Sequence, residues 1–226
     1  MSPMAFYKQL GVIPGVTAVI GSGGKTSLLR RLAEEVPGTV ILCTTTHIRP
    51  FAEYPLLAEP TPETVRQALT DSRVICLGVP CENGKLAAPA LPVETLARLA
   101  EHVLVEADGS RQLPLKAHGP HEPVLPAASR RTICVVGASG FGKPIRDAVQ
   151  RPERFCALTG AVETVPVTPE LAAQALLAER LCDTVFLNQL DGPKIPPEAR
   201  RFAADLTAQG FQVWGGSLRS GCVYPL

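Results

Sequence analysis

The sequence lacks a surplus of charge of either sign. Its 226 residues carry 22 basic and 21 acidic side chains, which gives a formal net charge of +1. It also lacks a dense run of lysine and arginine and a basic patch with interleaved aromatic residues, the features that a nucleic-acid-binding surface requires. These absences argue against a nucleic-acid partner and favour a small-molecule ligand.

Long apolar runs are absent as well. No stretch approaches the roughly 20 apolar residues of a membrane-spanning helix, and residues 1–8 lack the basic and then apolar pattern of a secretory signal. We therefore expect no membrane partner and a cytoplasmic location. Hydrophobic residues still make up 46% of the chain, which predicts one domain, residues 1–226, with a substantial core.

The seven cysteines form no C-x-x-C pair and no Cys/His cluster with zinc-finger spacing. This pattern argues against a disulfide framework and a structural zinc site. Cys43, Cys76 and Cys134 lie within apolar runs, where cysteine usually behaves as a small buried hydrophobic residue.

Short runs rich in β-branched residues alternate with amphipathic helix patterns. The predicted strands are 16–20, 40–45, 74–77, 102–105, 132–136, 184–187 and 211–214, and the predicted helices are 25–35, 62–69, 93–100, 169–181 and 197–209. Strands that are apolar throughout are typical of a sheet buried on both faces. We therefore predict an α/β, three-layer fold like that of P-loop NTPases, with a mainly parallel sheet of about seven strands and helices on both faces. Ligands of such sheets bind at the carboxyl ends of the strands.

The segment Gly21-Ser22-Gly23-Gly24-Lys25-Thr26-Ser27 joins the first predicted strand to the first predicted helix. This layout directs backbone N–H groups and the positive end of a helix toward one point, where a phosphate can bind. Lys25 can reach a terminal phosphate and Thr26 can hold Mg²⁺, so the segment predicts a site for ATP or GTP with Mg²⁺. The loop is shorter than the standard P-loop, because Val19 stands where that motif has its first glycine. A glycine-rich turn without a ligand would share part of the pattern.

Glu106 and Asp108 directly follow the predicted strand 102–105. A nucleotide hydrolase needs one carboxylate in this position to hold Mg²⁺ and a second to orient the attacking water. We therefore predict Thr26, Glu106 and Asp108 as the metal site. The alternative is an aspartate that caps a helix beside a solvated glutamate.

Asn188-Gln189-Leu190-Asp191 follows the predicted strand 184–187 and resembles the N-K-x-D element with which many P-loop GTPases bind guanine. The resemblance predicts that Asn188 braces the loop and that Asp191 binds the base. Gln189 stands where those enzymes have lysine, which leaves the choice between ATP and GTP open. Asn and Asp are also common after strands for reasons of turn geometry alone.

Two further segments are candidates for the site. Residues 44–47, three threonines and a histidine, close a predicted strand where P-loop enzymes sense the terminal phosphate, although a threonine-rich strand end is an equal alternative. Residues 108–129 show no helix or strand pattern, and a loop of that length is usually functional. Its Arg111, Lys116 and His118 could clamp an anionic substrate, with His118 carrying a proton. A rigid, solvated proline loop is the alternative.

We predict catalytic roles for Lys25, Glu106 and Asp108 together with Arg111, Lys116 and His118.

A second glycine-rich segment, 137–144, also follows a predicted strand. Pro144 replaces the Ser or Thr that would follow a phosphate-binding lysine, and it removes a backbone donor. We therefore predict a simple strand-to-helix turn there.

Several of these motifs, taken in order, resemble the YqeC family of selenium-dependent hydroxylase accessory, or selenium cofactor biosynthesis, proteins. They are residues 21–26, 44–47, 105–111 (V-E-A-D-G-S-R), 114–118 (P-L-K-A-H), 122–124 (E-P-V), 151–153 (R-P-E) and 188–191. The resemblance covers nearly the whole chain, and the central block is its most specific part. Gln150 stands where the family pattern has His.

The resemblance implies a P-loop protein that assists the maturation of selenium-dependent molybdenum hydroxylases. The implied partners are a small anionic selenium or molybdenum-cofactor species and a hydroxylase or another maturation protein. The leading interpretation is a Mg²⁺-dependent NTPase. A nucleotide-gated binding protein with little turnover and an ATP-dependent ligase or kinase acting on a small anionic substrate remain as alternatives.

Overall fold

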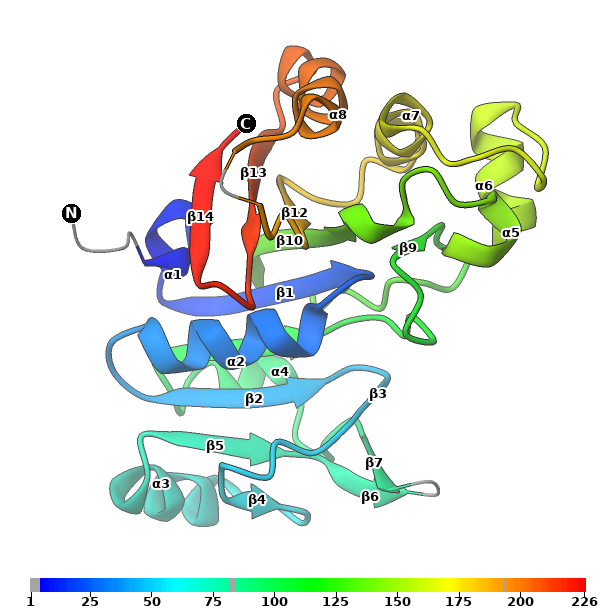
Figure 1. Cartoon of the computed structure of the whole chain (residues 1–226). Coiled ribbons are helices and arrows are strands. Elements are labelled where there is room, and N and C mark those ends of the chain that lie inside the picture. The colour runs from blue at the N-terminus through cyan, green and yellow to red at the C-terminus, as the bar shows by residue number, and fades with distance from the viewer. Residues whose placement is uncertain (1–4, 82–83, 193) are drawn as a thin grey trace.

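A nine-stranded sheet forms the centre of the computed structural model, which describes residues 5–81, 84–192 and 194–226 (Figure 1). In spatial order the strands are β14 (Cys222–Pro225), β13 (Gln212–Ser217), β12 (Thr184–Asn188), β10 (Ser129–Gly137), β1 (Gly15–Gly21), β8 (His102–Glu106), β2 (Val40–Thr44), β5 (Val74–Leu77) and β4 (Leu56–Leu57). Neighbouring strands pair in parallel, except that β14 runs antiparallel to β13. The predicted α/β fold and all seven predicted strands are confirmed, and β4 and β14 extend the sheet at its two edges.

The five predicted helices are present as α2 (Lys25–Glu35), α3 (Pro62–Asp71), α4 (Val93–Leu96), α7 (Pro169–Glu179) and α8 (Pro197–Ala208). Proline occupies the first turn of α3, α7 and α8, and a threonine side chain caps α3 and α7. The helix predicted over 93–100 ends early because its last turn is tightened by i→i−3 hydrogen bonds. The predicted helix ranges do not include α1 (Phe6–Gln9), α5 (Ile145–Ala148) or α6 (Pro152–Thr159).

Alternate residues of the strands pack against helices on opposite faces of the sheet. Val19 of β1 lies in a cluster with the buried leucines of α2, whereas Ala18 and Ile20 pack with α7 and α8. A third cluster joins Val16 to α3 and α4 on the same face as Ala18. The buried, free Cys43, Cys76 and Cys134 belong to these clusters, as predicted.

Smaller elements lie beyond the carboxyl ends of the main strands (Figure 1). The segment 108–129, predicted to lack regular structure, contains β9 (Leu115–Lys116), which pairs in parallel with β11 (Val149–Gln150). A three-stranded sheet is formed by β3 (His47–Ile48), β7 (Lys85–Ala87) and β6 (Val79–Cys81). The 3₁₀ turn η2 (Ala138–Gly140) and α5 follow β10, which confirms the strand-to-helix turn predicted there. None of the helices in the described part of the chain combines the length and apolar character that crossing a bilayer requires.

Candidate functional site

The glycine-rich loop turns the chain from β1 into α2 through positive φ angles. Gly21 has φ 89° and Gly23 has φ 87°. A Cβ on Gly21 would lie 2.3 Å from the Val135 carbonyl oxygen, and one on Gly23 would lie 2.5 Å from the Gly137 Cα. Both positions therefore require glycine, because a side chain would meet fixed backbone as well as an unfavourable conformation.

The loop delivers the uncapped end of α2 to a cavity. The first N–H groups of an α-helix have no partner within the helix, and no side chain among the described residues caps those of α2. The cavity has a volume of about 630 Å³, within the range of small-molecule sites. It lies at the carboxyl ends of the strands, as predicted, and its lining includes residues 23–27, Arg30, Arg31, Glu34, Glu106, Ser110, Gln112, Leu113, 188–189, Asp191 and 217–219.

Glu106 and Thr26 present oxygen atoms to this cavity. The Thr26 hydroxyl donates to Glu106 Oε2 at 3.0 Å, and Lys25 Nζ lies 3.8 Å from Glu106 Oε1. Burial raises the pKa of Glu106, although Lys25 and Thr26 oppose the rise. Hard oxygen donors beside a helix N-terminus fit Mg²⁺, which is bound through few protein oxygens together with phosphates and water. No cluster of three or more His, Cys, Asp or Glu side chains suited to a metal occurs among the described residues.

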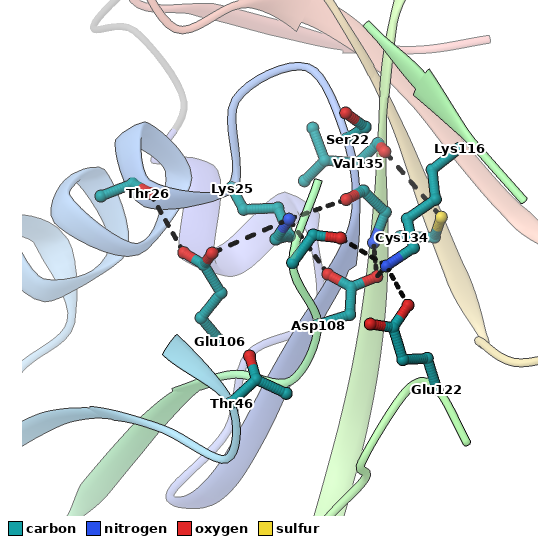
Figure 2. Close-up of polar contacts among 12 residues, drawn as sticks. Ser22, Lys25, Thr26, Thr46, Glu106, Asp108, Lys116, Glu122, Cys134 and Val135 are labelled. Atoms are coloured by element: carbon teal, nitrogen blue, oxygen red, sulfur yellow. Dashed lines mark hydrogen bonds and ion pairs between the residues drawn. The ribbon is translucent and has the colours of Figure 1, made fainter. Parts of the chain in front are cut away.

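Asp108 lies under the loop as the centre of a buried ion network. Its side chain is 0% exposed, and Oδ1 lies 3.0 Å from Lys25 Nζ. Oδ2 accepts from the Gly21 N–H at 2.9 Å and lies 3.2 Å from Lys116 Nζ and 2.8 Å from His118 Nε2. Burial would raise the pKa of Asp108, but hydrogen bonding to His118 and the two lysine charges lower it to about 2. Asp108 does not line the cavity, but it pairs directly with Lys25, which does (Figure 2).

Lys116 and His118 complete this network from the segment predicted to hold a substrate. Lys116 Nζ lies 2.7 Å from Glu122 Oε2, which also accepts from Arg151 Nη1 at 2.6 Å. His118 Nδ1 lies 2.7 Å from Oε2 of Glu179, which is the last residue of α7. Burial lowers the pKa of His118, but the hydrogen bonds to its two carboxylates outweigh that effect and raise it to about 9.

The network places the predicted residues in two groups. The cavity is lined by Lys25, Thr26 and Glu106, whereas the side chains of Lys116 and His118 are 0% and 2% exposed beneath it. Arg111 is exposed and does not belong to the cavity lining.

Sequence reasoning missed three members of the network as site residues, namely Glu122, Arg151 and Glu179. Glu122 and Arg151 belong to the motifs E-P-V and R-P-E, which offered a signal. Glu179 is the last residue of α7 and belongs to no such motif, so it offered none.

Asn188 ties the glycine-rich loop to the chain that follows β13. Its Nδ2 donates to the Gly23 carbonyl oxygen at 2.8 Å, and its Oδ1 accepts from the Leu218 N–H at 3.1 Å. These bonds agree with the bracing role predicted for Asn188. Asp191 accepts a hydrogen bond from the Ser217 hydroxyl. Gln189, with φ 70°, instead accepts at its Oε1 from the Ser139 N–H at 3.2 Å.

Comparison with known proteins places these motifs in one family. A family model described as "YqeC protein" matches residues 17–153, which include the glycine-rich loop and most of the ion network. A curated relative, "Uncharacterized protein YqeC" of Escherichia coli (strain K12), is 33% identical over 188 residues, which cover 77% of this chain and 70% of the relative. The chain belongs to the YqeC family.

Proposed function

We propose that this protein binds a nucleoside triphosphate with Mg²⁺ in the cavity and hydrolyses its terminal phosphate. The observation that carries the proposal is the uncapped first turn of α2, which opens into the cavity beside Lys25, Thr26 and Glu106. Free N–H groups, the helix dipole and a lysine together stabilise bound phosphate. Asn188 and Asp191, which also line the cavity, would contact the rest of the nucleotide.

The metal would be held by the Thr26 hydroxyl and the Glu106 carboxylate. Mg²⁺ would supply neutralisation of charge on the phosphate oxygens during transfer. Lys25 is at present held by the Gly21 carbonyl oxygen at 2.8 Å and by Asp108. When its ammonium turns to the terminal phosphate, Asp108 keeps Lys116 and His118 as counter-ions. The release of Lys25 therefore leaves no buried carboxylate without a partner, which makes the movement energetically accessible.

The cellular role that we propose is assistance in the maturation of selenium-dependent molybdenum hydroxylases. The bound nucleotide would drive a step on a small anionic selenium or molybdenum-cofactor species, in contact with a hydroxylase or another maturation protein. Support comes from membership of the YqeC family, whose model matches residues 17–153 and so includes the segment 105–124. Asp108, Lys116 and Glu122 of that segment form the part of the ion network that packs beneath the glycine-rich loop.

A nucleotide-gated binding protein is the second candidate, and one set of contacts favours it. The Thr44 hydroxyl donates to the Glu106 carbonyl oxygen at 2.7 Å, and the Thr45 hydroxyl donates to the Val124 carbonyl oxygen at 2.8 Å. A change at Glu106 on binding of metal and phosphate would therefore reach two neighbouring loops. Slow or absent phosphate release together with tight nucleotide binding would select this candidate over the hydrolase.

The test is nucleotide-dependent thermal stabilisation of wild type and Lys25→Ala with Mg²⁺. A ligand at about 100 times its Kd adds roughly 2.7 kcal/mol, which raises Tm by about 5–11 °C in a protein of this size. We expect this shift in wild type and its loss in Lys25→Ala, because the ammonium no longer offsets phosphate charge.

The matched control is Lys143→Ala, which removes an exposed lysine from the other glycine-rich turn and should keep the full shift. Melting without nucleotide measures separately what Lys25→Ala does to the fold. A wild-type shift that survives in Lys25→Ala, or the absence of a shift with ATP and with GTP in the wild type, would contradict the proposal.

A further inference from the structure

We infer that the part of the cavity lined by Asp191 selects guanine over adenine, an inference that rests on the proposed nucleotide site. The phosphate end is fixed by the loop after β1, and β12 and β13 are the second and third strands along from β1 on one side. The glycine-rich loop itself reaches the end of β12, where Asn188 Nδ2 donates to the Gly23 carbonyl oxygen at 2.8 Å. The residues that follow β12 and β13 line the cavity directly beside that loop, and a base attached to a phosphate bound there would lie against them.

Asp191 is the acidic residue in this part of the cavity lining, and its carboxylate is held in place. The Ser217 hydroxyl donates to Oδ1, and the Ser220 N–H donates to that hydroxyl at 3.1 Å. The Leu190 N–H donates to the Gly216 carbonyl oxygen at 3.0 Å, which fastens the turn itself to β13. No described residue donates a hydrogen bond to Oδ2, so a preorganised acceptor remains available to a ligand.

The chemistry of the two purines decides which of them this acceptor recognises. An ionised carboxylate can only accept hydrogen bonds. Guanine presents two adjacent donors, the N1–H and the exocyclic N2 amine, which one carboxylate can accept together, because Oδ1 keeps a second lone pair beside its bond from Ser217. Adenine presents an unprotonated N1 at that position, so an acceptor would face an acceptor. Hydrogen bonds to a charged group contribute enough to predict at least about a tenfold preference for guanine.

The residue in the place of the GTPase lysine does not supply this selectivity. Gln189 Oε1 accepts from the Ser139 N–H at 3.2 Å and its Nε2 donates to the Gly23 carbonyl oxygen at 3.5 Å, which holds the side chain between the glycine-rich loop and the turn after β10. Apolar contact with a base can come instead from Leu218, which lines the cavity. Leu218 Cδ1 also lies close to the phosphate loop, 3.4 Å from where a Cβ of Gly24 would stand. Gln189, which stands where the N-K-x-D element has lysine, therefore does not occupy the carboxylate oxygen of Asp191 that is available to a ligand.

Calorimetry with nucleoside diphosphates and Mg²⁺ tests the inference without hydrolysis. Wild type should bind GDP at least about tenfold more tightly than ADP and than the xanthine diphosphate, whose C2 carbonyl replaces the donor amine. Inosine diphosphate, which keeps N1–H and lacks the amine, should bind with intermediate affinity. Asp191→Asn adds a donor, so it should lose the preference for GDP and bind the xanthine nucleotide at least about tenfold more tightly than wild type does.

The control is Asp205→Asn, which removes an exposed carboxylate of α8 outside the cavity lining and should bind like wild type. Equal affinities of wild type for GDP and ADP would overturn the inference and leave the proposed nucleotide site standing. Unchanged base preference in a folded Asp191→Asn would do the same. Failure of every nucleotide to bind wild type would remove the proposed function as well. If Asp191→Asn does not fold, the affinities of wild type for GDP, ADP and the inosine and xanthine diphosphates decide whether the site selects guanine.

Discussion

Replacement of Asp108 by Asn should destabilise the protein strongly, because the carboxylate is the shared counter-ion of three buried cations. Lys25, Lys116 and His118 lie at 3.0, 3.2 and 2.8 Å from its oxygens. Asparagine keeps the shape of the side chain and an oxygen for the Gly21 N–H but loses the negative charge. Removal of one partner from a buried ion pair costs about 3–5 kcal/mol.

The geometry places the expected loss at the lower end of that range. Each cation keeps a second carboxylate, since Lys25 lies 3.8 Å from Glu106, Lys116 lies 2.7 Å from Glu122 and His118 lies 2.7 Å from Glu179. We therefore expect a loss of about 3 kcal/mol, which corresponds to a fall in Tm of roughly 6–12 °C. Urea unfolding monitored by circular dichroism measures the free energy of unfolding, and thermal melting provides an independent check.

Glu106→Gln is the matched comparison, because its side chain makes one hydrogen bond, to Thr26, and a longer contact with Lys25. Glu106→Gln should lower the free energy of unfolding by only about 1 kcal/mol. The rate of Mg²⁺-dependent nucleotide hydrolysis should fall by about 100-fold or more. A double-mutant cycle of Asp108→Asn with Lys116→Met should show a coupling of about 0.5–3 kcal/mol. Stability of Asp108→Asn within about 1 kcal/mol of wild type, or strict additivity with Lys116→Met, would refute the counter-ion role.

Two further predictions concern the loop and the core. Gly23→Ala should lower Tm more than Gly142→Ala, because both positions have positive φ but only the Gly23 Cβ would meet backbone, 2.5 Å from Gly137; equal melting temperatures would contradict this. His102 is buried, neither ring nitrogen has a hydrogen-bond partner among the described residues, and burial lowers its pKa. The unfolded chain then takes up the proton first, so the stability contributed by neutral His102 is complete above about pH 6.5 and is lost as the pH falls. The free energy of unfolding, measured by urea titration at pH 7.5 and 5.5, should fall less between these pH values in His102→Leu than in wild type. An equal fall in both proteins would contradict this reasoning.

Local patterns predicted most of the sheet and the phosphate loop. Runs such as 132–136 form strands because β-branched and apolar side chains suit a sheet buried on both faces. The positive-φ turn after β1 required glycines, and the sequence displayed them. The parallel pairing of β1 with β8, with Val19 opposite Glu106, then brought the end of β8 beside the loop. That pairing explains why Thr26 and Glu106, 80 residues apart, could be assigned to one site.

Short elements had no comparable signal. Leu115–Lys116 and Val149–Gln150 are each two residues long, so no period of alternation can be read from them. They form strands because they pair with each other, and this pairing depends on how the two loops are packed. The edge strand β14 is likewise stabilised through its pairing with β13.

The sequence by itself determined that Lys25, Glu106 and Asp108 would gather at one end of the sheet, because parallel strands deliver their carboxyl ends to one edge. Only the tertiary structure decided which of the charged side chains face a ligand. His118 pairs with Glu179, 61 residues away on α7, and the same packing buries Lys116 beneath the loop. The composition of the segment 108–129 suggested an open substrate clamp, whereas the fold places two of its cations in a closed ion network. The physical reason is that the burial of a charge depends on the partners that distant elements bring to it, and no local pattern records those partners.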